Sequence, residues 1–314
     1  MKKIIILTAI ILLLSGCELT APQRYEKESL VVSGYLIAGK TVSIQHPIFV
    51  GRTISADGGT MDDILITNAE VKLMKLDINH VAQDTFALSF AIDIDNLLFG
   101  YQSEEVTIEP ATTYRIEVHA ILDSQDVFAW AETTVPETVE INIDYNGLAT
   151  PEYGFADEFS PDLPAIPYDN VNNDFPIYFA LNSDAILYTS YNFYCLEEFS
   201  TSLEYTIPFM NFTHLEEEDE EAYYSVMSNN LREVNMSWRY EPGQDDEGNW
   251  YRLDDFYAIG FSYYGQYRLT IYIVDQNYYT YHYHSESYLH GGIHGGIGYF
   301  GSVTGEDYFT RITR

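Results

Sequence analysis

Four histidines in the C-terminal part of the chain have the residue type and spacing of a metal site. They are His282, His284, His290 and His294. On a strand, His282 and His284 would point to one face and could share a Zn²⁺ or Cu²⁺ ion, whereas on a helix they would diverge by about 200°. Asp275 as N-cap and the two glycines after His290 favour a helix over residues 276–290, while the tyrosine-rich composition favours a strand. We expect the helix, and therefore exposed or hydrogen-bonded histidines, with a metal site as the alternative.

Two acidic clusters offer oxygen ligands of the kind that Ca²⁺ prefers. They are Asp93–Asn96 and Asp245–Asn249. Neither has the twelve-residue spacing of an EF-hand, with glycine at position six and glutamate at position twelve. Because Asp, Asn and Gly are also common turn residues, we expect two turns, and a calcium site is the alternative. The sequence thus requires no cofactor, and Zn²⁺ or Ca²⁺ are the metals that the histidines and these clusters would suit.

Aromatic residues in the second half of the chain are suited to stacking against sugar rings. Trp238, Tyr240, Trp250 and Tyr251 belong to strand-like segments next to loops, in a chain that has 28 tyrosines. Tyrosine rings in sheets more often fill a core and keep their hydroxyl groups at its rim. We expect the core arrangement, and glycan stacking by these four residues is the functional alternative.

Catalytic signatures are absent from the sequence. It contains no Gly-x-Ser-x-Gly elbow and no His-Glu-x-x-His helix, and Cys195 lies in an aromatic run that indicates a buried thiol. The glycine-dense segment 290–301 lacks the Lys-Ser/Thr pair of a phosphate-binding loop, so we expect tight turns from which Tyr299 and Phe300 enter the core. Hydrolysis by two carboxylates is an outside alternative, because nothing singles out a pair. We therefore assign no catalytic residues.

The charge balance narrows the range of partners. The chain has 15 Lys and Arg against 48 Asp and Glu, a net charge of −33, and no Lys or Arg occurs between Arg115 and Arg232. Nucleic acid and anionic lipid are bound through clustered Lys and Arg, so the composition excludes nucleic-acid binding and argues against docking on anionic head groups through protein charge. Hydrophobic residues make up 46% of the chain, too many for an acidic disordered protein. We expect a folded protein whose acidic stretch faces water or cations.

Residues 1–16 have the pattern of a bacterial lipoprotein signal peptide. Lys2 and Lys3 precede an apolar run from Ile4 to Leu14, which is too short to span a bilayer and leads into Ser-Gly-Cys at Cys17. The small residues before Cys17 suit a lipobox, in which the cysteine thiol receives diacylglycerol. Two or three acyl chains give an effectively permanent membrane anchor. We therefore expect a lipid-anchored cell-envelope protein, and Glu18 rather than Asp after the cysteine is compatible with the outer membrane.

Strand patterns dominate the rest of the chain. Residues 17–29 are a polar tether. Residues 30–137 contain about seven short strand-like segments separated by turns, which predicts an antiparallel sandwich of immunoglobulin-like or transthyretin-like type. We expect residues 138–314 to form a second β-rich domain with one or two short helices, because no segment has a long helical stripe.

Several of these segments together resemble a family of bacterial outer-membrane lipoproteins known as a domain of unknown function. The resemblance covers most of the mature chain and is carried by Leu30–Tyr35, Ile66–Leu73, Ile108–Val118 and Gly295–Gly301. It implies an N-terminal immunoglobulin-like sandwich and a second β-rich region. It also implies an outer-membrane lipoprotein often encoded near TonB-dependent receptors. No catalytic residues come with it.

These observations predict a non-enzymatic envelope lipoprotein, a binding or accessory subunit that associates with an outer-membrane transporter. The alternative is a surface lipoprotein that binds glycans or divalent cations, and a hydrolase is the less favoured third interpretation. The expected partners are the membrane, through the acyl chains, and the transporter.

Overall fold

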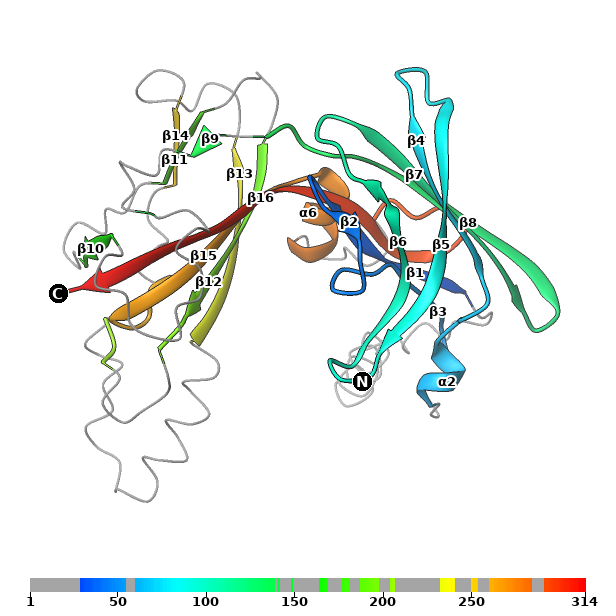
Figure 1. Cartoon of the computed structure of the whole chain (residues 1–314), viewed down its shortest axis with the longest axis horizontal. Coiled ribbons are helices and arrows are strands. Elements are labelled where there is room, and N and C mark those ends of the chain that lie inside the picture. Colours follow the sequence, from blue (N-terminus) through cyan, green and yellow to red (C-terminus); the bar gives the residue numbers. More distant parts are fainter. Residues whose placement is uncertain are drawn as a thin grey trace, which may run out of the picture.

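The computed structural model describes the chain in separate ranges, shown in Figure 1. They are residues 29–54, 60–138, 140–141, 148, 164–168, 177–180, 187–197, 204–206, 232–240, 250–253, 260–283 and 291–314. In these residues the chain is mostly β-structure, arranged in two large sheets and one small sheet with two short helices. The predicted fold, a sandwich followed by a β-rich region with a short helix, is confirmed.

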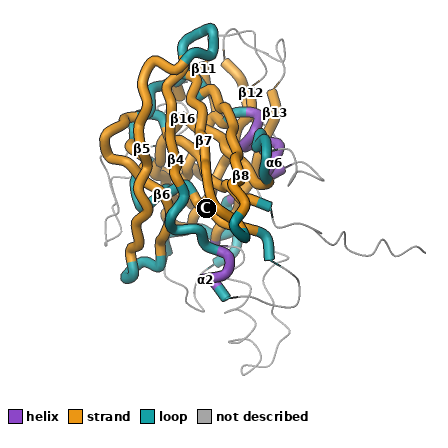
Figure 2. The backbone as a smooth tube through the Cα atoms, turned by 90° about the vertical axis from the view of Figure 1, so that its right-hand side faces the viewer, coloured by secondary structure: helices purple, strands orange, loops and turns teal. Residues whose placement is uncertain are grey.

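The first large sheet has six antiparallel strands from the N-terminal half. In spatial order they are β2 (Thr41–Val42), β6 (Leu98–Thr107), β5 (Ala82–Asp93), β4 (Glu70–Leu76), β7 (Thr113–Leu122) and β8 (Gln125–Thr134). The sequence of β7 alternates, so Tyr114, Ile116 and Val118 are fully buried while the residues between them face outwards. Figure 2 shows this sheet from its outer side, with β16 behind it.

The second large sheet joins strands from both halves of the chain. Its order is β13 (Glu233–Tyr240), β12 (Leu187–Cys195), β15 (Gly265–Val274), β16 (Ile297–Thr313), β1 (Leu30–Ile37) and β3 (Phe49–Arg52), and β10 (Ala165–Pro167) also pairs with β16. The small sheet consists of β14 (Trp250–Leu253), β11 (Ile177–Ala180) and β9 (Glu140–Ile141).

Strand β16 belongs to both halves of the molecule. Its residues 297–303 pair in parallel with β1, and its residues 303–312 pair antiparallel with β15. At a rise of about 3.3 Å per residue, its 17 residues extend about 55 Å. Val303 pairs with both Ile37 and Val274, and these three side chains form a small buried cluster of their own. The second sheet therefore crosses the boundary that the sequence predicts near residue 138, and that boundary remains a prediction.

Two hydrophobic cores lie along β16. The first packs β1, β3 and the start of β16 against the six-stranded sheet, with Leu36, Leu73 and Phe300 fully buried. The prediction that Tyr299 and Phe300 are buried is confirmed, although only Phe300 belongs to this core, and Tyr299 packs against the rings of α6. The second core covers one face of β12, β15 and the end of β16, and includes Tyr191 and Tyr267. Tyrosine rings thus act as core residues here.

A short helix, α6 (Gln276–Tyr283), lies against β16, and a single turn, α2 (Met61–Ile64), precedes β4. Asp275 caps α6, because its carboxylate accepts hydrogen bonds from the backbone N–H groups of Asn277 and Tyr278 at 3.3 and 3.0 Å. The predicted helix is confirmed over residues 276–283, and residues 284–290 lie outside the described ranges.

Candidate functional site

The second sheet has one apolar face and one polar face because its strands alternate. On β12, Tyr191 and Phe193 point into the second core, while Ser190 and Asn192 belong to the opposite face. The strand register places four polar residues in one row across four strands. From β13 to β16 the row is Asn235, Asn192, Thr270 and Asp307.

Hydrogen bonds hold this polar row in place. The Nδ2 group of Asn192 donates to Oδ1 of Asn235 at 2.9 Å and to Oε1 of Glu233 at 2.5 Å. Farther along the row, the hydroxyl of Thr270 donates to Oδ1 of Asp307 at 2.5 Å. Each side chain keeps additional donor or acceptor positions after these bonds, since an amide and a carboxylate offer several. The row is therefore ordered and can still bond to a ligand.

Aromatic side chains from α6 and β1 form a wall beside the row. The rings of Tyr278 and Tyr35 meet edge to face at 5.4 Å, and His282 tilts against Tyr278 at 4.4 Å. The hydroxyl of Tyr283 is hydrogen-bonded to that of Ser190 at 2.6 Å, which connects the wall to the sheet. Nδ1 of His46 lies 3.3 Å from the hydroxyl of Tyr35. These contacts hold the rings in place, and the hydroxyl and imidazole groups of several of them line the same space.

The space between wall and sheet is an open groove of about 700 Å³. A volume of this size is typical of small-molecule sites. The groove is lined by Tyr35, Lys40, His46, Ser190, Asn192, Glu233, Asn235, Arg268, Thr270, Tyr272, Tyr278, His282, Tyr283 and Asp307. The lining includes two of the chain's 15 Lys and Arg residues, Lys40 and Arg268. It also includes two carboxylates, Glu233 and Asp307, in a protein of strongly negative net charge.

Burial keeps most of the titratable wall residues uncharged. Desolvation raises the pKa of Tyr272 to about 12 and also raises the pKa values of Tyr278 and Tyr283. Desolvation lowers the pKa of His46, with a further effect from Lys40, and contact with the tyrosine rings desolvates His282 and lowers its pKa as well. At neutral pH the wall therefore presents phenol and neutral imidazole groups.

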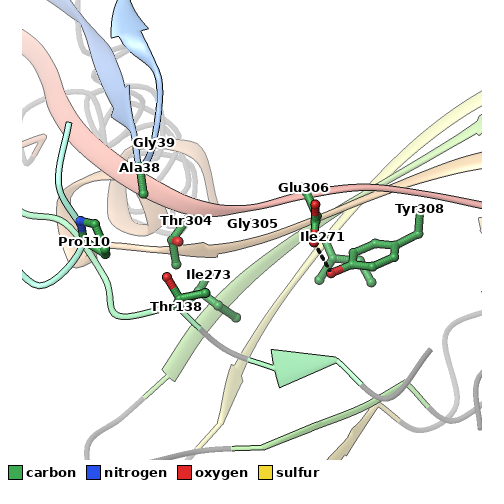
Figure 3. Close-up of a pocket in the computed structure, with 10 residues that line it drawn as sticks. All are labelled: Ala38, Gly39, Pro110, Thr138, Ile271, Ile273, Thr304, Gly305, Glu306 and Tyr308. Atoms are coloured by element: carbon green, nitrogen blue, oxygen red, sulfur yellow. Dashed lines mark hydrogen bonds between the residues drawn. The ribbon is translucent and has the colours of Figure 1, made fainter. Parts of the chain in front are cut away.

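A second, smaller cavity lies beside β16 at the place where its pairing passes from β1 to β15. Figure 3 shows this cavity of about 280 Å³ and its lining residues, Ala38, Gly39, Pro110, Thr138, Ile271, Ile273, Thr304, Gly305, Glu306 and Tyr308. The Tyr308 hydroxyl donates to Glu306 at 3.2 Å. With few polar side chains converging on it, this cavity has less to offer a ligand than the groove.

The structure gives the predicted metal ligands separate surroundings. His282 lies on α6 against tyrosine rings, and His294 stacks on Trp130 at 4.2 Å, with backbone hydrogen bonds between those two residues. His284 and His290 lie outside the described ranges. Among the residues that the structure describes, no three His, Cys, Asp or Glu side chains gather where they could hold a metal ion. A site formed by all four histidines remains a prediction.

The described acidic cluster forms a turn. The Asp93 carboxylate accepts hydrogen bonds from the backbone N–H groups of Asp95 and Asn96 and from the Asn96 side chain, which donates at 2.8 Å. The bonds from Asn96 lower the pKa of Asp93. These are the contacts expected of turn chemistry. The cluster at residues 245–249 lies outside the described ranges.

The four predicted sugar-stacking residues are divided between two sheets. Trp238 and Tyr240 lie on β13, where they pair with Thr189 and Leu187, whereas residues 250 and 251 lie on β14 of the small sheet. The sequence did not identify the tyrosines that line the groove. The run of tyrosines after Asp275, which the helix brings against the sheet, was the feature that could have indicated them.

Of the two cysteines, Cys195 lies within the described residues and Cys17 lies outside them. Cys195 is fully buried, and desolvation raises the pKa of its thiol to about 11, so it is unreactive at neutral pH. This confirms the interpretation of Cys195 as a small core residue. Cys17 lies outside the described ranges, and its acylation remains a prediction.

Comparison of the sequence with family models and with curated proteins gives no match. The resemblance to the lipoprotein family therefore remains a prediction. In the described residues, no helix has the length and apolar composition needed to cross a bilayer.

Proposed function

We propose that this protein is a lipid-anchored binding protein of the cell envelope whose groove binds a neutral glycan. The observation that carries the proposal is the combination of the hydrogen-bonded polar row on the sheet with the tyrosine wall beside it. Glycan binding makes direct use of the polar and aromatic residues that line the groove.

The chemistry of the groove suits sugar rings. Sugar hydroxyl groups act as donors and acceptors at once, and the amide of Asn192, the hydroxyl of Thr270 and the carboxylate of Asp307 can meet both needs. The apolar faces of sugar rings pack against aromatic side chains, which Tyr35 and Tyr278 provide. A neutral ligand is favoured over a polyanion because the net charge of −33 repels anions over long range.

The two groove carboxylates lie on strands that are not neighbours, Glu233 on β13 and Asp307 on β16. Each accepts a hydrogen bond from a side chain on a strand between them, Glu233 from Asn192 and Asp307 from Thr270. A glycoside hydrolase needs two carboxyl groups that flank the scissile bond, one as the acid and the other as the base or nucleophile. Nothing in the groove singles out these two residues for such roles, so binding without hydrolysis is the function proposed.

Support for the lipid anchor and for the membrane location comes from the sequence and not from the groove. Acylation of Cys17 would hold the protein at a membrane, and Glu18 together with the family resemblance favours the outer membrane. Association with an outer-membrane transporter rests on the family resemblance alone, and the groove neither requires nor opposes it.

Titration calorimetry with neutral oligosaccharides, an acidic polysaccharide and Ca²⁺ tests the proposal. We expect heat of binding with at least one neutral glycan, and about tenfold weaker binding for Thr270→Ala, because a tenfold change corresponds to about 1.4 kcal/mol, the contribution of one hydrogen bond. Thr134→Ala is the matched control, since Thr134 makes a similar cross-strand hydroxyl contact with Thr113 on the other sheet. Binding of Ca²⁺ alone, or equal losses in both variants, would contradict the proposal.

A further inference from the structure

Three hairpins of the sandwich carry apolar side chains that the fold leaves in water, and two of them lie at the same end. The third is the β4–β5 hairpin, where Ile78 is 95% and Val81 is 56% exposed. At the β5–β6 turn, Ile94 and Leu97 are each 79% exposed and Ile92 is 60% exposed. Near the β7–β8 turn, Ile121 is 72% exposed and Phe128 is 41% exposed. Five exposed apolar residues on two hairpins at one end are a feature of interaction surfaces.

Both tips lie at the end of the sandwich where β1 begins. The antiparallel bridge between Ile48 and Tyr101 means that β3 and β6 run side by side in opposite directions, so the β5–β6 turn lies near Arg52. Arg52 pairs with Leu30 in the sheet, and its guanidinium lies 3.8 Å from the carboxylate of Asp123 in the β7–β8 turn. Figures 1 and 2 show both turns and α2 toward this end, and the β4–β5 turn at the opposite end.

Leu97 also occupies an unfavourable backbone conformation. Its φ is 55°, in the left-handed region that costs a residue with a Cβ roughly 1–2 kcal/mol and that glycine and asparagine adopt more easily. The exposed leucine gains no packing energy in return. A residue that costs stability without contributing to the core points to a role outside the fold.

We propose that this end of the sandwich inserts its hairpin tips into the membrane that holds the acyl anchor. The inference rests on the proposed anchor at Cys17. Ser29 follows Cys17 by twelve positions, and a chain of that length reaches only about 40 Å at full extension. The anchor therefore keeps this end close to the bilayer, and insertion of the tips becomes an intramolecular second contact that needs little affinity of its own. Docking fixes the orientation of the protein on the membrane.

The charges at the tips define the kind of lipid surface. Asp93, Asp95, Asp123 and Asp126 lie at the two turns beside the aliphatic residues, with Arg52 as the neighbouring cation. These carboxylates repel anionic head groups. The tips are therefore suited to a zwitterionic lipid surface that they enter through apolar contact, not to a negatively charged one.

Site-specific fluorescent labelling of the acylated full chain tests the inference. Cys195 is fully buried and Cys17 carries the lipid, so a cysteine introduced as Leu97→Cys or Ile121→Cys is the one that a polarity-sensitive dye reaches. Ile78→Cys is the matched control, because Ile78 is 95% exposed in the β4–β5 turn at the opposite end. In phosphatidylcholine vesicles we expect a blue shift and quenching by a lipid-borne quencher at positions 97 and 121, and neither effect at position 78.

The outcomes distinguish a failure of the anchor from a failure of tip insertion. If the acylated chain fails to sediment with vesicles, the anchor is wrong and the insertion proposal falls with it. If it sediments but all three labels stay in water, or all three respond alike, the anchor stands and tip insertion is refuted. Replacing part of the phosphatidylcholine with phosphatidylserine should reduce the blue shift at position 97, and an increase there would contradict the choice of a zwitterionic surface.

Discussion

At the scale of single residues, Asp275 connects more parts of the molecule than any sequence motif suggested. Its carboxylate caps α6, accepts the Thr133 hydroxyl of β8 at 2.8 Å, and accepts the backbone N–H of Ser302 in β16 at 3.0 Å. Burial of this carboxylate is the largest influence on its pKa and raises it, while the hydrogen bonds oppose the change. The prediction of an N-cap at this position captured one of these roles.

A pH-dependent stability follows from the raised pKa of Asp275. Because its pKa is higher in the folded chain than its ordinary 3.8, its stabilising contribution is complete below pH 3.8 and is lost as the pH rises through the folded pKa. Asp275→Asn should unfold more easily by about 1–2 kcal/mol, since it loses acceptors for buried donors. Its deficit relative to the native chain should be largest at acid pH and should narrow as the pH rises. Urea unfolding between about pH 4 and 7 measures this, and a widening deficit would contradict it.

Leu97 should be replaceable with a gain in stability. Leu97→Gly removes the Cβ that makes a φ of 55° unfavourable, so we expect a free energy of unfolding higher by about 1 kcal/mol in the absence of membranes. Leu97→Ser is the control, because it removes the apolar side chain and keeps the Cβ. Urea unfolding of both variants measures the difference. Equal stability of the glycine and serine variants would show that backbone strain is not the cause.

At the scale of elements, the sequence predicted strands and the helix well where pattern and capping agree. Alternation identified β7, and Asp275 identified the start of α6. Neither signal says which strand an element pairs with. The groove needs Asn192, Thr270 and Asp307 in one row and α6 beside them, and that depends on register between segments far apart in the chain. Local sequence patterns therefore could not predict the groove, although the sequence contains the residue types that line it.

The packing of α6 against β16 should depend on Gly301. A Cβ at this position would lie 2.8 Å from both Oδ1 of Asp275 and the Cβ of Tyr278, closer than the structure allows without movement. Gly301→Ala should lower the free energy of unfolding by about 1–3 kcal/mol and should displace α6, weakening ligand binding in the groove. Urea unfolding and near-ultraviolet circular dichroism of the tyrosines measure the two effects.

Gly39→Ala is the comparison for the Gly301 variant. Gly39 has a φ of 78° but open space around its missing Cβ, so alanine there adds backbone strain of about 1–2 kcal/mol without a clash. The tyrosine dichroism should stay unchanged in this variant. A spectrum altered equally by both substitutions would contradict a specific role for Gly301 in seating α6.

At the scale of the whole molecule, β16 makes the two halves depend on each other. The last described strand lies next to the first described strand, and Phe300 joins a core whose other fully buried residues come from the N-terminal half. Further contacts join the two halves at this part of β16, such as the hydrogen bond between the hydroxyl groups of Thr133 and Ser302 at 2.6 Å. The sequence indicated that residues around Phe300 enter a core but not which one, because a strand pattern carries no information about distant partners.

The N-terminal sandwich should therefore be unable to fold without the start of β16. A fragment of residues 30–138 lacks the partner strand of β1 and leaves the place of Phe300 empty, so the edge of β1 and the first core are both open to water. We expect no cooperative thermal transition for this fragment. Fusing residues 291–303 to it through a flexible Gly/Ser linker of about 20 residues should restore one, and Phe300→Ala within the fusion should weaken the rescue by about 3–5 kcal/mol. Calorimetry and circular dichroism of the three proteins decide the matter. A cooperative transition in the fragment alone would show that residues 30–138 are an independent domain and that β16 only attaches to it.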